Sequence, residues 1–218
     1  MKILVACEYS GIVRDAFLKR GHNAVSCDIL PSESYFGRTY RHYQGDVRDI
    51  LDDDWDMMIA HPPCTYLAVS GAAWFYHPED KHLPTDQRRP HPKYPNRREH
   101  QKEAIDFVKL LLNAPIEKIA LENPVGVIST KIRKPNQIIQ PYMFGHKESK
   151  KTCLWLKNLT SLNSTKNVEP EYYITKNGEQ RSKFDYDTMK LPKEERWKVR
   201  SATFPGIAEA MANQWGDN

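Results

Sequence analysis

Two consecutive prolines follow a short apolar run near the start of the chain, and they restrict its fold more than any other feature. The run is Met57–Ala60, and Pro62, Pro63 and Cys64 stand just beyond it. Apolar runs of this length are typical of buried strands, whereas a Pro-Pro step lacks the N–H groups that would continue a sheet. The chain must leave the sheet there, which predicts a thiol at the carboxyl end of a strand.

A second apolar run ends in a similar way, in a carboxylate instead of a thiol. Lys118–Leu121 has the pattern of a strand, and Glu122, Asn123 and Pro124 follow it. In open parallel sheets, ligands bind at the carboxyl ends of the strands. The two runs together favour Cys64 as a nucleophile that works with Glu122. Taken alone, Cys64 would be a buried apolar side chain, and Glu122 a helix-terminal acid or a salt-bridge partner.

Strand and helix patterns alternate along the first part of the chain. Ile3–Cys7 and Asn23–Cys27 are apolar runs of strand length, and Ser10–Arg20 between them carries apolar residues at helical spacing. Glu99–Asn113 has one apolar helix face, and Pro115 ends it. This alternation predicts an α/β fold with a mainly parallel sheet and helices on both faces.

The length of 218 residues suits one α/β domain with a small addition. We expect a core domain over residues 1–156, with a basic loop at residues 77–102. Residues 157–200 are polar and show little periodicity, which predicts a small irregular insertion. Apolar residues return at helical spacing afterwards, so residues 201–218 are predicted to end the chain in a helix.

Positive charge is concentrated in one segment. The formal net charge is only +4, with an isoelectric point near 8.7. Between Lys81 and Lys102, seven basic residues accompany two acids, and prolines recur throughout. This pattern predicts a solvated loop of low helix content, and contact with phosphates is its best functional interpretation. Trp74, Phe75 and Tyr76 precede the loop and would either pack in the protein or stack on bases.

Composition disfavours several classes of protein. The four cysteines are widely separated, which argues against a zinc ribbon or a disulfide framework and for reduced thiols. Histidines such as His61 match no common ligand spacing, so no metal site is expected. The chain starts without a secretory signal pattern, and no stretch approaches the ~18 apolar residues of a membrane span. We therefore expect a soluble cytoplasmic protein, with Cys7, Cys27 and Cys153 inert in its core.

The order and spacing of these motifs resemble the DNA cytosine-5 methyltransferase family. That family has a catalytic cysteine in a Pro-Pro-Cys loop and a glutamate in a Glu-Asn-Val-like loop, as Cys64 and Glu122 stand here. Residues 201–210 are similar to the family's final motif, whose helix packs back beside the cofactor. The resemblance implies a Rossmann-like methyltransferase fold, S-adenosylmethionine (SAM) as cofactor and DNA as partner. It also implies that Cys64 adds to carbon 6 of cytosine while Glu122 assists at nitrogen 3.

The resemblance assigns further residues to the cofactor and to the nucleic acid. Asp28 occupies the place of the acid that holds the ribose hydroxyls, and Asp46 that of the acid at the adenine amino group. As alternatives, Asp28, Asp46, Glu8 and Ser10 would cap helices. The cofactor set is Cys7, Glu8, Tyr9, Ser10, Gly11, Asp28, Ile29, Asp46, Val47 and Pro62. The nucleic-acid set is Pro63, Ser70, Arg88, Arg89, Arg97, Arg98, Asn123, Lys150 and Lys151.

Two departures from the family keep other functions open. The cofactor loop carries one glycine, Gly11, where the family has several, and only residues 157–200 stand where a large recognition domain follows. The compact chain is similar to short enzymes encoded by phages and prophages, which would act in the host cytoplasm. The alternatives are a phage-type pyrimidine-modifying enzyme that uses RNA, a free nucleotide or another donor, and a non-catalytic protein that binds nucleic acid.

The implied mechanism sets two expectations for the site. A basic environment should lower the pKa of the Cys64 thiol, with Lys150, Lys151 or Arg133 as its source. The pKa of the Glu122 carboxyl should be raised enough for it to share a proton with the base.

Overall fold

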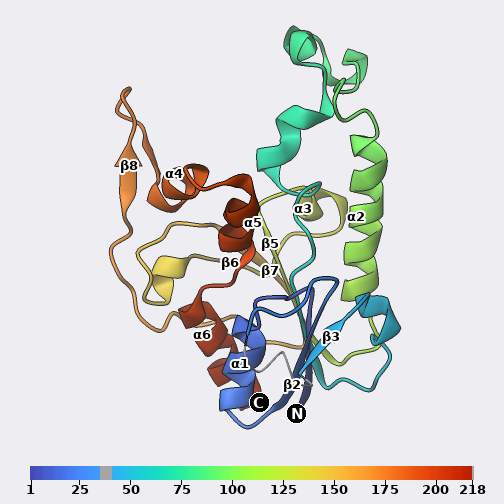
Figure 1. Cartoon of the computed structure of the whole chain (residues 1–218), viewed down its shortest axis with the longest axis vertical. Coiled ribbons are helices and arrows are strands. Elements are labelled where there is room, and N and C mark those ends of the chain that lie inside the picture. Colours follow the sequence, from blue (N-terminus) through green and yellow to red (C-terminus); the bar gives the residue numbers. More distant parts are fainter. Residues whose placement is uncertain (35–40, 218) are drawn as a thin grey trace.

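The molecule is a sheet with helices on both faces and two projections at one edge (Figure 1). The computed structural model describes residues 1–34 and 41–217. The strands in those ranges are β1 (Lys2–Ala6), β2 (Asn23–Asp28), β3 (His42–Gln44), β4 (Met57–Ala60), β5 (Lys118–Pro124), β6 (Gln137–Ile139), β7 (Thr152–Lys157), β8 (Tyr172–Ile174) and β9 (Gln180–Ser182). The α-helices are α1 (Ile12–Lys19), α2 (Arg97–Leu112), α3 (Ile128–Lys131), α4 (Lys183–Met189), α5 (Lys193–Ser201) and α6 (Pro205–Gly216).

The main sheet is mostly parallel, as the alternating pattern predicts. Within the described ranges its order is β3-β2-β1-β4-β5-β7-β6. Neighbouring strands from β3 to β5 are parallel, whereas β7 is antiparallel to both β5 and β6. The α/β class of the prediction is therefore confirmed. The strand order reverses between β1 and β4, which makes this point the switch point of the sheet.

Side chains of the central strands alternate between two hydrophobic layers. Ile3 and Ile59 face the layer that includes α1 and α6. Leu4 and Met58, one position along, face the layer that includes α2 and α3. All four side chains are fully buried, because helices cover both faces and each strand is apolar along its whole length.

Helix α6 packs back on the core beside α1. Pro205 stands at its first position, where the missing N–H costs nothing and the fixed φ suits a helix. The next residue, Gly206, must be small, because a Cβ there would lie 2.0 Å from the carbonyl oxygen of Phe144. Trp215 is fully buried, and its indole Nε1 donates to the Thr160 carbonyl at 2.9 Å. These contacts fix the segment that leads into α6 against the sheet.

Residues 157–200 contain more regular structure than their lack of periodicity predicts. They form the β8–β9 hairpin followed by α4 and α5. Charge pairs support α4, since Asp187 contacts the Lys183 amine at 2.8 Å and the Lys190 amine at 3.0 Å. Tyr173 of the hairpin stacks on Tyr186 of α4, with ring centroids 3.8 Å apart. Helices held by ion pairs and ring contacts carry no apolar stripe, so apolar periodicity does not reveal them.

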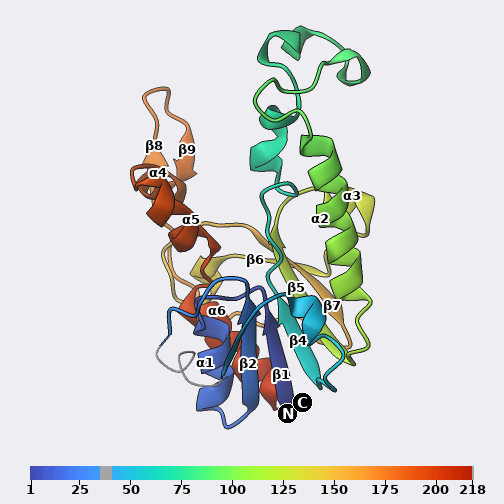
Figure 2. The ribbon, with the colours of Figure 1, turned by 45° about the vertical axis from the view of Figure 1, so that its right-hand side comes forward.

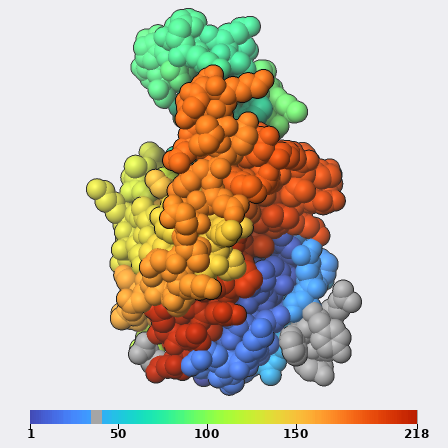
Figure 3. Space-filling view, turned by 90° about the vertical axis from the view of Figure 1, so that its left-hand side faces the viewer, coloured from blue at the N-terminus to red at the C-terminus, as the bar shows by residue number. Residues whose placement is uncertain are grey.

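Two projections rise from the carboxyl edge of the parallel strands and stand apart in both ribbon views (Figures 1 and 2). The basic projection comprises residues 69–96, and the C-terminal projection comprises residues 170–201. In the space-filling view the basic projection extends beyond the rest of the molecule (Figure 3). It contains the 3₁₀ helices Val69–Phe75, Pro78–His82 and Thr85–Gln87, and α2 begins where it ends. The basic segment therefore has more helix than its many prolines predict.

None of the helices in the described ranges is long and apolar enough to cross a membrane.

Candidate active site

The register of the parallel strands brings candidate residues to one edge of the sheet. Ala60 ends β4 and is in register with the last residue of β1 and with Leu121 of β5. Cys7, His61 and Glu122 come directly after these three positions. They therefore occupy neighbouring places at the switch point, where sheets of this kind bind ligands.

The loop that carries Cys64 is fixed to strand β5. The side-chain amide of Asn123 donates a hydrogen bond to the Pro62 carbonyl at 2.7 Å. The carbonyl of Cys64 accepts from the amides of Leu67 at 3.0 Å and Ala68 at 2.9 Å, which closes a turn. Cys64 itself is exposed. The rigid prolines and this turn hold the thiol at the surface, directly beyond the end of β4.

The loops that follow β4 and β5 are joined further along by backbone hydrogen bonds. The Val69 amide donates to the Val125 carbonyl at 3.1 Å, and the Val127 amide to the Leu67 carbonyl at 2.9 Å. Gly126 lies between these contacts, and a Cβ there would be 2.1 Å from the Leu67 oxygen. Only glycine allows the two loops to approach so closely. Glu122, Asn123 and the Cys64 loop therefore form one connected unit, which we call the β4–β5 side.

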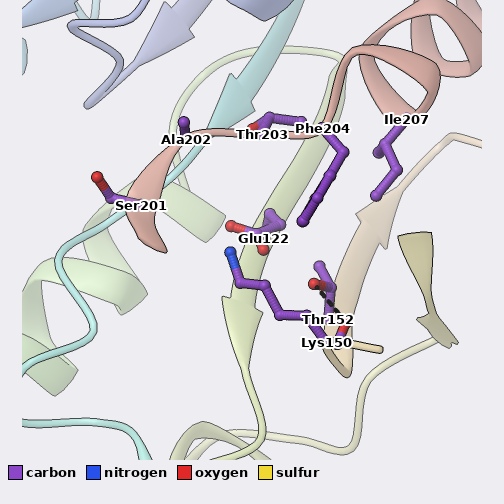
Figure 4. Close-up of a pocket in the computed structure, with 8 residues that line it drawn as sticks. All are labelled: Glu122, Lys150, Thr152, Ser201, Ala202, Thr203, Phe204 and Ile207. Atoms are coloured by element: carbon purple, nitrogen blue, oxygen red, sulfur yellow. Dashed lines mark hydrogen bonds between the residues drawn. The ribbon is translucent and has the colours of Figure 1, made fainter. Parts of the chain in front are cut away.

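Glu122 lies inside β5 and not at its end, because β7 pairs with β5 through Pro124. The Nδ1 atom of His61 is 3.3 Å from Oε2 of Glu122. Figure 4 shows the Lys150 amine pointing toward the Glu122 carboxylate. The pocket at this carboxylate is lined by Glu122, Lys150, Thr152, Ser201, Ala202, Thr203, Phe204 and Ile207. Residues 202–204, which connect α5 to α6, thus form part of the wall of the pocket around the Glu122 carboxylate.

The pKa of Glu122 is lower than the usual value for a glutamate. Burial alone would raise this pKa, but the hydrogen bond and the charge of His61 oppose it, with smaller contributions from Lys150 and Thr152. The net direction is downward, so the carboxyl is ionised at neutral pH. The expectation that the pKa of Glu122 is raised is therefore wrong for the free protein, because the cationic neighbours outweigh the loss of water.

The pKa of the Cys64 thiol is raised, which contradicts the expectation of a lowered value. Cys64 is exposed as a residue, yet partial loss of water around the thiol raises its pKa, and the charge of Glu122 raises it further. Lys150 and Arg200 act in the opposite direction without reversing the shift. Of the expected cations, Lys150 is in place, whereas Arg133 donates to the Leu156 carbonyl at 3.0 Å. Loss of water, the larger cause, and the Glu122 charge together outweigh the two cations.

The loop that follows β1 caps helix α1. The buried Glu8 carboxylate accepts from the amides of Val13 at 2.7 Å and Arg14 at 3.2 Å. The Ser10 hydroxyl donates to it at 3.3 Å. Burial raises the pKa of Glu8, and His61 and these amides oppose the shift without cancelling it. The capping role given as the alternative for Glu8 is therefore present in the structure. Gly11, with φ of +76°, makes the turn into the helix.

Tyr9 connects the same loop to the C-terminal projection. Its hydroxyl donates to the Lys198 carbonyl and shares a hydrogen bond with Ser201, both at 3.1 Å. Its ring lies against Trp197, with centroids 5.4 Å apart. A salt bridge of 2.5 Å between Lys198 and Glu33 strengthens the contact. Helix α5 is thereby docked on the segments that follow β1 and β2.

Asp28 and Ile29 stand at the carboxyl end of β2. Asp28 Oδ1 accepts from the Leu30 amide at 3.0 Å, which forms a local turn. Burial raises the pKa of Asp28, although the neighbouring backbone amides and His42 oppose the shift. The Ile29 side chain is 75% exposed. An exposed isoleucine beside a carboxylate provides an apolar platform next to a hydrogen-bond acceptor.

Asp46 follows β3 and caps the 3₁₀ helix Val47–Asp49. Its Oδ1 accepts from the Arg48 amide at 2.9 Å, and its Oδ2 pairs with the Arg48 guanidinium at 2.8 Å. Capping, the alternative for this aspartate, is thus its observed local role, and Val47 is buried in the core. Residues 7–11, 28–30 and 45–50 lie at the carboxyl ends of β1, β2 and β3, and we call them the β1–β3 side of the edge.

The other cysteines are more enclosed than Cys64. Cys27 and Cys153 are buried, and Cys7 is partly buried with φ of +58°. Burial raises the pKa of the Cys27 thiol to about 12, and it raises the pKa of the Cys7 thiol further. Neutral, buried thiols are weak nucleophiles, in agreement with the core role expected of Cys27 and Cys153.

Several cations of the basic projection hold the projection itself together. Arg97 is buried, donates to the Thr65 carbonyl at 2.6 Å, and lies over the ring of Phe75 at 4.9 Å. Arg89 pairs with Asp80 at 2.6 Å, and this contact keeps the pKa of Asp80 well below its usual range. Arg88 donates to backbone carbonyls of the same projection. Arg98, Ser70, Pro63 and Lys151 are exposed.

The aromatic residues before the basic segment divide between packing and exposure. Phe75 is buried, and Tyr76 is covered by Arg98, whose guanidinium carbon is 4.8 Å from the ring centroid. Trp74 is 48% exposed and meets His91 and Tyr94 edge-on. One of the three aromatic residues therefore presents a ring to solvent on the projection.

His61 is the residue that sequence reasoning missed, because it was weighed only as a metal ligand. Its side chain is 8% exposed and contacts Glu122. Its position in the sequence was a signal for this role. His61 directly follows the apolar run of β4, just as Glu122 directly follows the apolar run Lys118–Leu121, so both are expected at the same edge of the sheet. The contact itself depends on the register of β4 and β5. Across residues 1–34 and 41–217, no group of three or more His, Cys, Asp or Glu gathers in the manner of a metal site.

The comparisons with known proteins include a distant structural likeness. No family model matches the chain, and no curated protein matches it. One solved structure with a similar arrangement is a candidate DNA modification methyltransferase encoded within a prophage of E. coli, at 11% identity and a TM-score of 0.40. The alignment covers 71% of this chain and 45% of that one. The chain therefore spans less than half the length of the protein it matches.

Proposed function

We propose that this protein is a SAM-dependent methyltransferase that modifies carbon 5 of cytosine in DNA, with Cys64 as nucleophile and Glu122 at the ring. One observation carries the proposal. The exposed Cys64 thiol and the Glu122 carboxylate belong to one unit, in which Asn123 of β5 holds the Pro62 carbonyl at 2.7 Å. The two groups also interact electrostatically, since Glu122 raises the pKa of the thiol.

The chemistry needs these two groups at one edge. Carbon 5 of cytosine is a poor nucleophile until a thiolate adds to carbon 6 and converts the ring to an enamine. The addition places negative charge on the ring at nitrogen 3, where a carboxyl group can form a hydrogen bond and pass a proton. After methyl transfer a base removes the proton from carbon 5 and the sulfur leaves. Cys64 supplies the sulfur and Glu122 the contact at nitrogen 3.

The β1–β3 side fits the proposed cofactor. The Asp28 carboxylate stands at the carboxyl end of β2, the place at which doubly wound sheets hold ribose hydroxyls. Beside it the exposed Ile29 side chain offers an apolar surface for a flat ring. Residues 7–11 and Asp46 complete this side, next to the switch point between β1 and β4. SAM bound there would supply an electrophilic methyl group.

The surface next to Cys64 supports a nucleic-acid substrate. The basic projection leaves the core five residues after Cys64 and carries the exposed residues Ser70 and Trp74, and the exposed Arg98 follows it in the first turn of α2. Cations and an exposed aromatic ring are the side chains that contact phosphates and unstacked bases. A cytosine within a duplex must leave the stack to reach Cys64, and the projection is placed to contact the DNA around it.

The test is covalent trapping. The protein is incubated with SAM and with DNA that contains 5-fluorocytosine, in which the fluorine cannot leave as a proton does. We expect a denaturant-stable complex with the wild-type protein and none with Cys64→Ala. Cys27→Ala is the matched control, because that cysteine is buried and its substitution should leave the complex intact. Failure to trap any tested DNA with a folded protein would contradict the proposal.

Nucleoside mass spectrometry of DNA and RNA from cells that express the protein identifies the product. 5-Methyldeoxycytidine supports the proposal. Another modified pyrimidine would indicate a different acceptor or donor, and the absence of SAM binding in calorimetry would favour a non-catalytic protein.

A further inference from the structure

His61 stands between two glutamates at the switch point. Its side chain is 92% buried, and its Nδ1 lies 3.3 Å from Oε2 of Glu122 on β5. The loop after β1 carries Glu8, whose carboxyl pKa is raised by burial, and the charge of His61 opposes that shift. The His61 amide is bonded to the Ala6 carbonyl at 2.9 Å, which fixes the backbone between the two strands. The buried imidazole therefore contacts the Glu122 carboxyl directly and acts on the Glu8 carboxyl electrostatically.

The proposed reaction creates a need that this arrangement meets. Nitrogen 3 of the base must receive a proton as Cys64 adds to carbon 6, but Glu122 is ionised in the free protein and has no proton to give. Lys150 faces the same carboxylate, but its amine is bonded to the Arg200 carbonyl at 2.7 Å. His61 is the neighbour whose ring nitrogen contacts the carboxylate directly, and an imidazole can both hold and pass a proton.

We propose that His61 is a positioning residue that holds the proton for Glu122 in the free protein and delivers it when the base is bound. The use of that proton depends on the proposed function, whereas the existence of the His61–Glu122 proton pair does not.

The step balances without any further reactant. The exposed Cys64 thiol loses its proton to solvent, and the thiolate forms a bond to carbon 6. The C5=C6 electron pair then becomes a C4=C5 double bond, and the C4=N3 pair moves to nitrogen 3. The proton on His61 Nδ1 passes to the Glu122 carboxylate, and the carboxyl passes it to nitrogen 3. When the sulfur leaves, the C4=N3 bond forms again and the proton returns through Glu122 to His61, which restores the imidazolium.

The charged groups around the pair come from four segments. Glu122 belongs to β5, Glu8 to the loop after β1, and Lys150 to the segment before β7, while Thr152 of β7 is hydrogen-bonded to Glu122. Arg14 of α1 acts on Glu8. Carboxyl groups from two neighbouring segments thus interact with His61, and each of these carboxyl groups also has a cationic neighbour.

The pair can be tested without the reaction. In protein labelled with ¹³C at glutamate carboxyls, the Glu122 signal is identified by its loss in Glu122→Gln and followed across pH. In His61→Asn, whose side-chain amide keeps a donor near the Nδ1 position but carries no titrating proton, we expect the Glu122 midpoint to move to higher pH. An unchanged midpoint in the folded variant would overturn the proposal.

The chain offers a matched control at the surface. His100 Nδ1 is also 3.3 Å from a glutamate Oε2, that of Glu103, but these side chains are 48% and 75% exposed. His100→Asn should leave the Glu122 signal unmoved, because surface ion pairs are screened. If His61→Asn does not fold, ¹⁵N-histidine spectra of the wild-type protein decide the question. Protons on both His61 ring nitrogens while Glu122 is ionised support the proposal, and a ring with only one proton overturns it.

The reaction provides an independent arm. The trapping rate of His61→Asn should fall by about tenfold or more near neutral pH, with a change in its pH profile, because the proton source is lost. If His61→Asn shows the expected shift of the Glu122 midpoint but the wild-type protein never traps DNA, the proposed function is contradicted and the proton pair stands. Trapping that keeps the wild-type rate and pH profile in His61→Asn would overturn the delivery step.

Discussion

Glu8 follows β1 and Glu122 belongs to β5, the strands on either side of β4. Both carboxyl groups interact with His61, yet their pKa values move in opposite directions. Glu8 is bonded to the amides of Val13 and Arg14 in its own helix, and burial dominates its pKa. Burial also raises the pKa of Glu122, but the combined effects of His61, Lys150 and Thr152 from other segments outweigh it. Identical side chains at one edge of a sheet therefore acquire different roles from the partners that surround them.

The same difference separates the two sides of the edge. On the β1–β3 side, acids bond to amides two to six residues away, as Asp28 does with Leu30 and Asp46 with Arg48. On the β4–β5 side, the contacts of His61 with Glu122 and of Pro62 with Asn123 span 61 residues each. Local contacts keep each loop folded, whereas the long-range contacts place reactive groups relative to one another. Substitutions should separate these roles.

The largest difference is expected in trapping of 5-fluorocytosine DNA. Glu122→Gln should lower the trapping rate by about 10²-fold or more, because an amide cannot pass a proton to nitrogen 3. Glu8→Gln keeps an acceptor for the helix amides and should lose less than about tenfold. Rates are compared near neutral pH by denaturing electrophoresis. Equal losses in the two variants would remove the distinction between the glutamates.

The hydrogen bond between Asn123 and the Cys64 loop gives the next effect. Asn123→Ala leaves the Pro62 carbonyl without its partner and should lower the free energy of unfolding by about 1–3 kcal/mol. Asn113→Ala is the matched control, since its amide bonds a helix carbonyl at 2.8 Å on the surface. Denaturant titration of both variants measures the effect. A similarly small loss for both would show that the loop is held in another way.

The reactivity of the Cys64 thiol tests how the charges of Glu122 and Lys150 affect its pKa. Glu122→Gln should make alkylation of Cys64 by iodoacetamide several-fold faster at neutral pH, because removal of the carboxylate lowers the thiol pKa. Lys150→Gln should make it slower, because that amine lowers the thiol pKa. Mass spectrometry of the modified peptide gives the rates. Changes in the same direction would contradict the assigned charges.

The smallest effect concerns stability against pH. The pKa of Glu122 is lower in the folded protein than the usual glutamate value of 4.5, so its contribution to stability is present above that pH and is lost as the pH falls through the folded pKa. The pKa of Glu8 is raised, so its contribution is present below 4.5 and is lost as the pH rises through the folded pKa.

Unfolding curves of Glu8→Gln and Glu122→Gln measured from acid to neutral pH test these signs. Relative to the wild type, Glu122→Gln should lose stability as the pH rises, whereas Glu8→Gln should gain it. Parallel pH profiles for the two variants would show that the two pKa shifts do not have opposite signs.

The sequence predicted the elements that depend on apolar patterning. Met57–Ala60 and Asn23–Cys27 lie in strands, and Glu99–Asn113 corresponds to α2. The ion-paired helices α4 and α5 were hidden, because charged surfaces carry no period that points to a core. The two predicted pKa directions at Cys64 and Glu122 were wrong, because a pKa depends on charges that only folding brings together.

By itself, the sequence determined which groups reach the edge of the sheet. Apolar runs must be buried and prolines cannot continue a strand, so Cys64 and Glu122 follow from local rules that any fold of this chain must obey. Only the tertiary structure decided that His61 is the partner of Glu122. The reason is physical: register, burial and the charges of distant segments set the energy of an ionisable group, and none of these is a property of neighbouring residues alone.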